Sequence, residues 1–326
     1  SLLSGTILLN LDTEDDDELS VGCAGGIDTN TSYTYQEVPI QNGFSTLEIQ
    51  LSGLLGGHSG MDIDKGRGNA NKWMARLLWE LSQEQHIQLL HFDGGSLRNA
   101  IPREATAIIA VQDTVKARTQ INTFAHILKD EYTLIEPHFV LKAESTQSLL
   151  HALSDLDFKK IIATLCGVQN GVYRMSPDII GLVEASSSLA RVIIDKGSFT
   201  TQSLQRSSVE STKKEVSMTL RCAFENMGAT VEQSGDYPGW KPNSQSLILK
   251  EMRGLYRTLF NEEPKVKACH AGLECGLLSE KLPGVDMISF GPNIRAAHSP
   301  DECVQISSVQ KFWTYLLASL SQIPKA

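Results

Sequence analysis

Two side chains able to bind a metal ion follow strand-like segments near opposite ends of the sequence. Asp12 ends the apolar run of residues 6–11, which is typical of a strand covered on both faces in a mostly parallel sheet. His298 lies in a loop after the strand-like residues 285–290. Ligand sites of open α/β sheets lie beyond the carboxyl ends of strands, so both residues stand where such sites form. Zinc accepts nitrogen and oxygen donors and suits this pair. Taken alone, a loop aspartate such as Asp12 is more often a turn or cap residue, and a loop histidine such as His298 is more often exposed or structural.

A glycine-rich turn presents a second histidine. Gly56, Gly57 and Gly60 surround His58 and permit close backbone approach that larger residues would resist. This pattern is typical of an imidazole offered to a ligand, although a hairpin end with its histidine in solvent has the same composition. A serine-hydrolase elbow is excluded, because Met61 stands where that motif needs glycine.

Amide and guanidinium groups form the next candidates. Asn99 follows a glycine-rich turn, and Arg206 interrupts the strand-like residues 203–208. A guanidinium can bind a carboxylate through two hydrogen bonds. The alternatives are a surface ion pair for Arg206 and an ordinary turn amide for Asn99.

The loop of residues 270–276 combines an imidazole, a carboxylate and a thiol with two glycines, Gly272 and Gly276. It has the composition of an active-site loop, with Glu274 as its carboxylate. A nucleophilic cysteine beside His270 is conceivable, but packing as a small apolar residue is the better interpretation of Cys275.

Hydrophobic periodicity predicts the elements that carry these residues. Alternation over residues 45–54 predicts a half-buried strand, and apolar residues at three- and four-residue steps from Ala70 to Leu81 predict a helix. Scattered apolar residues at helical spacing predict helices over residues 129–177. Further strands are predicted at 86–92, 105–111, 181–194 and 198–208, and further helices at 115–128, 216–227, 248–259 and 309–320.

These elements predict an α/β protein with a mostly parallel sheet and an inserted α+β domain. Residues 1–44 and 231–326 are assigned to the parallel-sheet domain, and residues 45–230 to the insertion. A chain of 326 residues is long enough for two such domains.

Composition limits the class of protein. The net charge of -9 argues against a nucleic-acid partner, and no apolar run approaches the ~20 residues of a membrane helix. The first residues show no secretory signal pattern. The 6 cysteines are spread without a Cys-x-x-Cys pair, as in reduced proteins, so we expect a cytoplasmic protein.

Six ordered segments resemble the bacterial aminoacyl-histidine (Xaa-His) dipeptidases, which belong to the dinuclear-zinc aminopeptidase, carboxypeptidase and aminoacylase group. The resemblance covers essentially the whole chain. The segments are LNLDTE (9–14), GCAGG (22–26), GLLGGHSG (53–60), RNAIPREA (98–105), HAGLECG (270–276) and GPNIRAAHSPDE (291–302).

The resemblance implies a zinc-binding α/β domain with an inserted lid that also forms a homodimer. It implies that Asp12 and His298 are terminal ligands of two different zinc ions. His58 would be the lid histidine that reaches a partner subunit's site and polarises the scissile carbonyl. Asn99 and Arg206 would hold the substrate, with Arg206 facing its terminal carboxylate.

The same resemblance assigns Gly272 and Glu274 to the loop that lines the site. The implied substrate is a dipeptide with a C-terminal histidine, cleaved by zinc-bound water.

One departure from the family pattern bears on activity. The pattern has a His-x-Asp segment, a bridging aspartate and a Glu-Glu pair ahead of the strand at Thr6, and none of these precedes that strand here. We therefore expect the chain alone to be inactive and the activity to belong to a longer parent enzyme. The alternatives are a non-enzymatic dimerisation or binding module and, less favoured, a serine or cysteine hydrolase.

Overall fold

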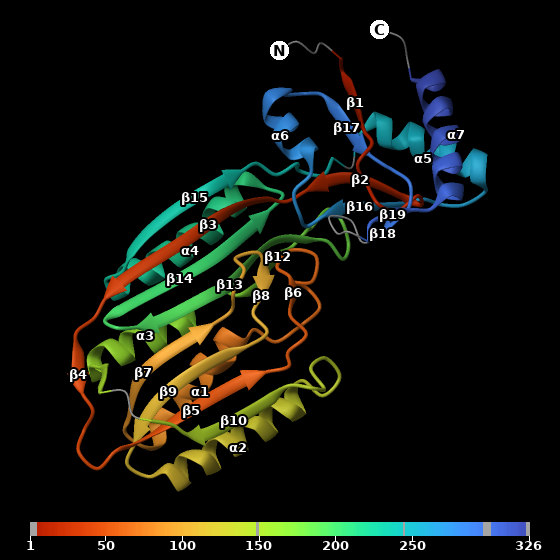
Figure 1. Ribbon diagram of the computed structural model, residues 1–326. Helices are drawn as coiled ribbons and strands as arrows, with labels where there is room; N and C mark the ends of the chain where they lie inside the picture. Colours follow the sequence, from red (N-terminus) through yellow and green to blue (C-terminus); the bar gives the residue numbers. More distant parts are fainter. Residues whose placement is uncertain (1–4, 148–149, 244, 296–300, 324–326) are drawn as a thin grey trace.

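A four-stranded sheet lies at one end of the molecule (Figure 1). The computed structural model describes residues 5–147, 150–243, 245–295 and 301–323. The strand order is β1 (Ile7–Asn10), β17 (Asp286–Ser289), β2 (Glu18–Cys23) and β16 (Lys265–Cys269). β1 pairs parallel with β17 and β2 parallel with β16, while β17 and β2 are antiparallel. The prediction of a mostly parallel sheet is confirmed.

Three helices and a short pair of antiparallel strands accompany this small sheet. They are α5 (Leu247–Phe260), α6 (Glu274–Lys281), α7 (Ile306–Gln322), β18 (Ile294–Arg295) and β19 (Cys303–Val304).

A larger sheet forms the rest of the molecule, and all strand pairs among its described residues are antiparallel. Its order is β10 (Val140–Ser145), β5 (Ser45–Ser52), β9 (Ala105–Val111), β7 (Ile87–Gly94), β13 (Val183–Asp195), β14 (Ser198–Ser207), β3 (Gly25–Thr34) and β15 (Thr230–Tyr237), with β12 (Gly171–Met175) also on β13. Two small pairs complete the strands. They are β4 (Glu37–Pro39) with β11 (His151–Leu153) and β6 (Gly57–His58) with β8 (Ala100–Ile101).

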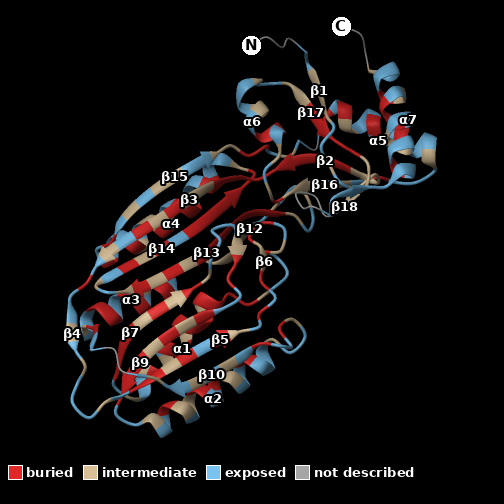
Figure 2. Ribbon diagram, in the orientation of Figure 1, coloured by how far each residue is buried: buried red, intermediate tan, exposed pale blue. Residues whose placement is uncertain are grey.

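Four helices cover one face of the large sheet: α1 (Ala70–Glu84), α2 (Thr114–Glu131), α3 (Asp155–Gly167) and α4 (Glu210–Met227). The predicted apolar stripe of α1 is buried, and Gly228 ends α4 in the left-handed conformation at φ 98°, as predicted. Figure 2 shows the buried residues concentrated between these helices and the central strands.

The chain passes between the two sheets at two adjacent places. Ala24 joins β2 to β3, and residues 238–240 follow β15. Cys23 and Trp240 exchange two backbone hydrogen bonds of 2.9 Å, so the two crossings form one hydrogen-bonded ribbon. Both predicted domain boundaries, 44/45 and 230/231, fall within residues that accompany the large sheet. We propose a division at Ala24 and after Tyr237 instead.

Two predictions about elements need correction. Residues 129–177 contain the helix α3 but otherwise form the strands β10, β11 and β12. The run of residues 6–11 is a strand, but its residues in β1 are only half-buried, whereas β17 beside it is largely buried.

A lysine on α1 closes the end of α3. The Lys72 Nζ atom donates to the carbonyls of Leu165, Cys166 and Val168 at 2.8, 2.6 and 3.0 Å. The last carbonyls of a helix lack partners within it and carry partial negative charge, so an ammonium stabilises them.

Lys72→Met should therefore lower the free energy of unfolding by about 2 kcal/mol, because several buried carbonyls lose a charged donor. Urea denaturation measures this. Lys160→Met, which alters an exposed lysine of α3, is the matched control and should change stability little. Equal effects of the two substitutions would contradict the capping role.

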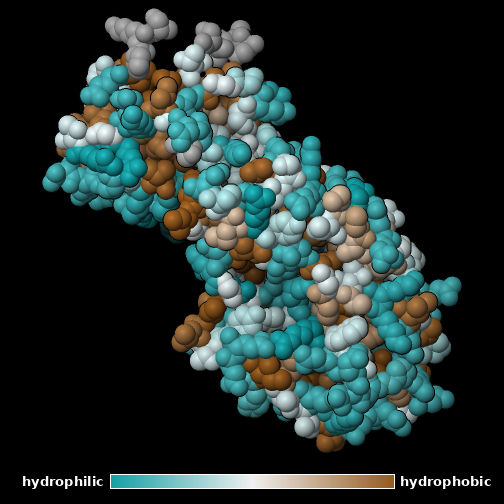
Figure 3. All heavy atoms as spheres, turned by 180° about the vertical axis from the view of Figure 1, so that it is seen from behind, coloured by the Kyte–Doolittle hydropathy of each residue, from teal (hydrophilic) through white to brown (hydrophobic). Residues whose placement is uncertain are grey.

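The surface differs between the two parts. Large apolar side chains are exposed along α7: Ile306, Val309, Trp313, Leu317 and Leu320. Apolar side chains also gather on the part of Figure 3 that carries the small sheet. Among the described residues, no helix is long and apolar enough to cross a membrane.

Candidate functional site

The loop that presents His58 is fastened at both ends by one buried glutamate. The carboxylate of Glu136 accepts hydrogen bonds from the backbone amides of Leu55 at 2.8 Å and Gly68 at 2.9 Å. Inside the loop, the Asp62 carboxylate accepts the His58 amide at 2.8 Å and pairs with Arg67. These contacts fix where the imidazole stands before any ligand arrives.

The tautomer of His58 follows from its backbone contacts. Its Nδ1 atom accepts the amides of Gly60 at 3.2 Å and Met61 at 3.1 Å. The neutral ring must then carry its hydrogen on Nε2. Burial, and next the Arg206 charge, lower the pKa of His58, so the ring is neutral at pH 7.

Arg206 meets His58 at that same nitrogen. The Arg206 Nη2 atom lies 3.3 Å from His58 Nε2, and Arg206 Nη1 donates to the Tyr237 hydroxyl at 2.9 Å. A guanidinium can only donate, so the contact with His58 brings two N–H donors together. An acceptor oxygen between them would satisfy both.

Arg206 is also an unusual buried charge. It is 4% exposed, and no carboxylate among the described residues lies within ion-pair distance of it. Its Nε atom has no hydrogen-bond partner among those residues. Buried charges are normally paired, so this guanidinium is suited to an anionic ligand. A surface ion pair, the alternative considered for Arg206, is excluded.

The loop after β16 packs directly on the His58 loop. A Cβ atom on Gly60 would lie 2.1 Å from the His270 carbonyl oxygen, 3.1 Å from His58 Cε1 and 3.2 Å from Arg206 Cδ. His270 itself is buried, with Nε2 2.7 Å from the Ser186 hydroxyl. Residues from β6, β14 and the β16–α6 loop therefore meet at one place.

His270 gives stability a pH dependence. Burial, and then the Arg206 charge, lower its pKa to about 3. An unfolded histidine titrates near about 6.5, so on acidification the unfolded chain takes up a proton that the folded chain refuses. Its contribution to the free energy of unfolding should fall by about 2 kcal/mol between pH 7 and pH 5.

Urea denaturation at pH 7 and pH 5 measures this loss, which His270→Gln should remove. His126→Gln, at an exposed histidine of α2, should keep it. The same pH dependence in both variants would contradict the assignment to His270.

Asn99 lies beside the His58 loop. Its backbone carbonyl accepts the Ser59 amide at 2.9 Å, and β6 pairs with β8 next to it. Arg98 binds the Asp28 carboxylate of β3 and so fixes this turn to the large sheet. The Asn99 side chain is exposed at the rim of the cluster.

Gly272 and Glu274 follow His270 in the same loop. A Cβ atom on Gly272 would lie 3.4 Å from Tyr237 Cε2, so the loop approaches the tyrosine that holds Arg206. Glu274 is exposed in the first turn of α6. Burial raises the pKa of the Cys275 thiol to about 12, which opposes a nucleophilic cysteine and agrees with a packed one.

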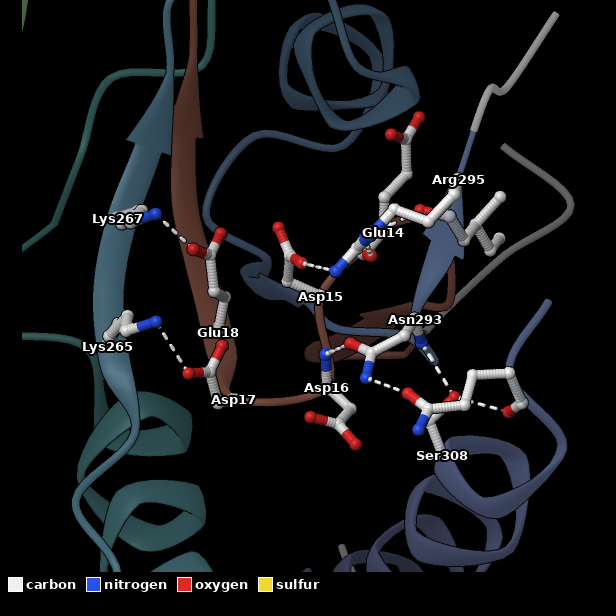
Figure 4. Close-up of polar contacts among 12 residues, drawn as sticks. Glu14, Asp15, Asp16, Asp17, Glu18, Lys265, Lys267, Asn293, Arg295 and Ser308 are labelled. Atoms are coloured by element: carbon white, nitrogen blue, oxygen red, sulfur yellow. Dashed lines mark hydrogen bonds and ion pairs between the residues drawn. The ribbon is translucent and has the colours of Figure 1, made fainter. Parts of the chain in front are cut away.

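The end of β1 lies beside the segment that leads toward His298. Figure 4 shows the acidic residues after Asp12 bound to this segment and to β16. Asp16 N donates to Asn293 Oδ1 at 2.7 Å, and Arg295 donates to the Glu14 carbonyl and the Asp15 carboxylate, both at 2.8 Å. Hydrogen bonds and ion pairs therefore hold the acidic stretch in place.

Asp12 and His298 are the two expected zinc ligands. Asp12 is exposed just after β1, and His298 lies outside the described residues. Within the described ranges, no three His, Cys, Asp or Glu side chains are grouped to hold a metal ion. The described residues therefore do not fit a complete zinc site.

A His-x-Asp triplet does occur later in the chain, at His91-Phe92-Asp93, and sequence reasoning overlooked it. It lies in β7 of the large sheet, where His91 Nδ1 is 3.3 Å from the Asp195 carboxylate and Asp93 pairs with Arg191. These contacts give His91 and Asp93 a structural role within the large sheet.

The cluster also contains three residues that the sequence did not suggest: Tyr237, Ser186 and Glu136. Tyr237 stands in the turn-rich segment 236–240, which indicated only a break between elements. Nothing local marks Ser186 or Glu136, because their partners are distant in the sequence.

Comparison with known proteins shows which family the chain resembles. The family model described as the peptidase dimerisation domain matches residues 49–134. The cytosol non-specific dipeptidase of Escherichia coli (strain K12) is 40% identical over 324 residues, which cover 99% of this chain and 67% of that protein.

A solved structure is equally similar. The crystal structure of the aminoacylhistidine dipeptidase from Vibrio alginolyticus is 41% identical, with a TM-score of 0.95 over 99% of this chain and 66% of that one. The chain thus spans about two thirds of the length of both relatives. The resemblance carried by the six sequence segments is confirmed. The chain belongs to the M20 family of metallopeptidases, with these dipeptidases among its relatives.

Proposed function

We propose that this chain supplies the substrate-recognition part of a zinc-dependent dipeptidase that cleaves Xaa-His dipeptides. The observation that carries the proposal is Arg206, a buried guanidinium without a carboxylate partner among the described residues, 3.3 Å from a histidine nitrogen that must also donate. A dipeptide brings its own carboxylate to such a place.

The two donors divide the work. Arg206 binds the C-terminal carboxylate of the substrate, since a guanidinium pairs with a carboxylate through two hydrogen bonds. His58, held as the Nε2–H tautomer, donates to the carbonyl oxygen that gains negative charge during attack. In a dipeptide these two acceptor groups are separated only by the amide nitrogen and one Cα atom, so donors 3.3 Å apart suit a dipeptide.

The other residues proposed from the sequence surround His58 and Arg206. Asn99 contributes an exposed amide beside His58. Gly272 and Glu274 follow His270 after β16, where Gly272 approaches Tyr237. The resemblance expects His58 to act in a partner subunit's site, and the match to a peptidase dimerisation domain supports a homodimer. In the single chain, His58 lies against its own Arg206.

Zinc would activate the attacking water and polarise the carbonyl in the complete enzyme. We propose Asp12 and His298 as one ligand for each of two zinc ions. The described residues offer no group of three ligands, so we expect the remaining ligands and the general base to come from elsewhere in a longer parent enzyme. The name of the Escherichia coli relative supports a cytoplasmic location.

The test is release of histidine from glycyl-histidine by the chain, with two equivalents of Zn²⁺ and, separately, with EDTA. We expect little release in either case, and binding of the dipeptide in both. Zinc-dependent turnover would support the dipeptidase and overturn the expected inactivity of this chain. Turnover that EDTA leaves intact would contradict metal dependence, and absence of binding would favour a dimerisation module.

A further inference from the structure

Tyr237 connects Arg206 to the ribbon between the two sheets. Its hydroxyl accepts Arg206 Nη1 at 2.9 Å, and its ring occupies space that only glycine leaves open. A Cβ atom on Gly26 would lie 2.6 Å from the Tyr237 hydroxyl oxygen. The ring is therefore held closely against β3, with its hydroxyl directed at the guanidinium.

The backbone of Tyr237 lies directly after an irregularity in the pairing of β15 with β3. The register between β15 and β3 shifts between Ser234 and Tyr237, and Gly235 adopts φ 62° there. Such a bulge interrupts the ladder and redirects the strand. Tyr237 pairs with Gly26 again beyond the bulge, so contacts on its other side supplement this single pair in fixing its backbone.

Lys213 provides these contacts. It is 1% exposed on α4, and its Nζ atom lies 2.6 Å from Asp236 Oδ1, 2.7 Å from the Tyr237 carbonyl oxygen and 3.0 Å from Glu210 Oε2. Glu210 in turn accepts the Gly239 amide at 2.9 Å. One buried ammonium thus fastens residues 236–239 to α4.

We propose that Lys213 and Tyr237 are positioning residues for substrate recognition: Lys213 fixes the backbone of Tyr237, whose hydroxyl holds the Arg206 guanidinium in the orientation that binds a carboxylate. This inference rests on the proposed function of Arg206. A purely structural role would instead hold the ribbon together without affecting which ligand Arg206 prefers.

The experiment compares glycyl-histidine with its C-terminal amide by calorimetric titration of the full chain in EDTA. Tyr237→Phe keeps the ring and removes only the hydroxyl, so the Kd for glycyl-histidine should rise about tenfold while the Kd for the amide stays unchanged. Lys213→Met should act in the same direction, and Lys213→Arg should restore part of the preference.

The matched controls remove the same groups elsewhere. Tyr173→Phe deletes a hydroxyl that binds Glu215, and Lys214→Met deletes an exposed ammonium on the same helix. Neither should alter the ratio of the two Kd values. If Lys213→Met fails to fold, Asp236→Asn, at a half-exposed partner of Lys213, should reduce the ratio by a smaller factor.

A second readout is independent of ligand. The ¹⁵N side-chain resonances of Arg206 should be distinct and slowly exchanging in the wild type, and should be shifted or lost in Tyr237→Phe and Lys213→Met. Arg206 resonances that stay unchanged in Tyr237→Phe and Lys213→Met would overturn the positioning role. So would an unchanged ratio of the two Kd values in these variants, if Arg206→Met abolishes the preference for the carboxylate. Either result leaves the proposed function intact. A wild-type chain without preference for the carboxylate would overturn the proposed function, and the Arg206 resonances would still decide the placement.

Discussion

Arg206→Met should abolish the preference of the chain for dipeptides with a free C-terminal carboxylate. Removal of one partner of a buried, hydrogen-bonded charge pair costs several kcal/mol, so the Kd for glycyl-histidine should rise about 100-fold. The Kd for the C-terminal amide should change far less, because the amide offers no charge to the guanidinium. Titration calorimetry with both ligands measures the two effects.

The stability of the same variant should move in the opposite direction. The wild-type guanidinium is buried with its Nε atom unpartnered among the described residues, so its desolvation is poorly compensated. Methionine fills similar volume without a charge, and the free energy of unfolding should stay equal or rise. Lower stability together with unchanged binding would mean that Arg206 is structural.

Arg98→Met is the control for a nearby arginine. Arg98 is exposed and bound to the Asp28 carboxylate, so it already has its partner within the chain. Its loss should leave the carboxylate preference unchanged. Arg206→Lys should retain part of the preference, because an ammonium keeps the charge but not the two-pronged geometry.

Gly60→Ala should separate the two loops that form the site. The added Cβ atom would lie 2.1 Å from the His270 carbonyl oxygen, which is backbone and cannot rotate away. We expect a loss of about 1–3 kcal/mol in the free energy of unfolding from this overpacking. Binding of glycyl-histidine should also weaken at least about tenfold, because a shift of either loop displaces His58 from Arg206.

Gly254→Ala is the matched control. A Cβ atom on Gly254 would meet nothing within 4 Å, and the residue lies inside α5. Alanine is the better helix former, so this variant should be about 0.5–1 kcal/mol more stable. If Gly60→Ala behaved like Gly254→Ala in both stability and binding, the close approach of the two loops would be wrong.

Sequence periodicity predicted the elements whose buried residues are apolar. The α1 stripe and the β13–β14 hairpin follow the expected patterns and are buried as expected. β3 escaped prediction because its buried positions are polar. Thr29 donates to Gln205, and Thr31 lies 2.6 Å from the Thr201 hydroxyl, so hydrogen bonds across the sheet replace apolar packing there.

β10 escaped for a different reason. It is the edge strand of the large sheet, and most of its residues are exposed, so no apolar alternation marks it. Edge strands are commonly polar, which protects them from pairing with other chains. In residues 129–177, hydrophobic spacing was therefore a poor guide except at α3.

Part of the candidate site could be predicted because some of its residues stand in unusual local sequence. Examples are Arg206, which is the one charged residue of β14, and the glycines around His58. The supports of the site are not local: Glu136 reaches Leu55 and Gly68, and Tyr237 reaches Arg206 across the large sheet. Only the fold brings these residues together.

The most direct test of the central claim is a titration of glycyl-histidine into the metal-free chain, followed by NMR at the ring of His58 and the guanidinium of Arg206. We predict that both groups respond at the same ligand concentration and that the pKa of His58 rises on binding because the carboxylate held by Arg206 lies close to it. The C-terminal amide should give a weaker response at Arg206 and no rise in the pKa of His58. A response to both ligands alike, or none at these two residues, would contradict the account.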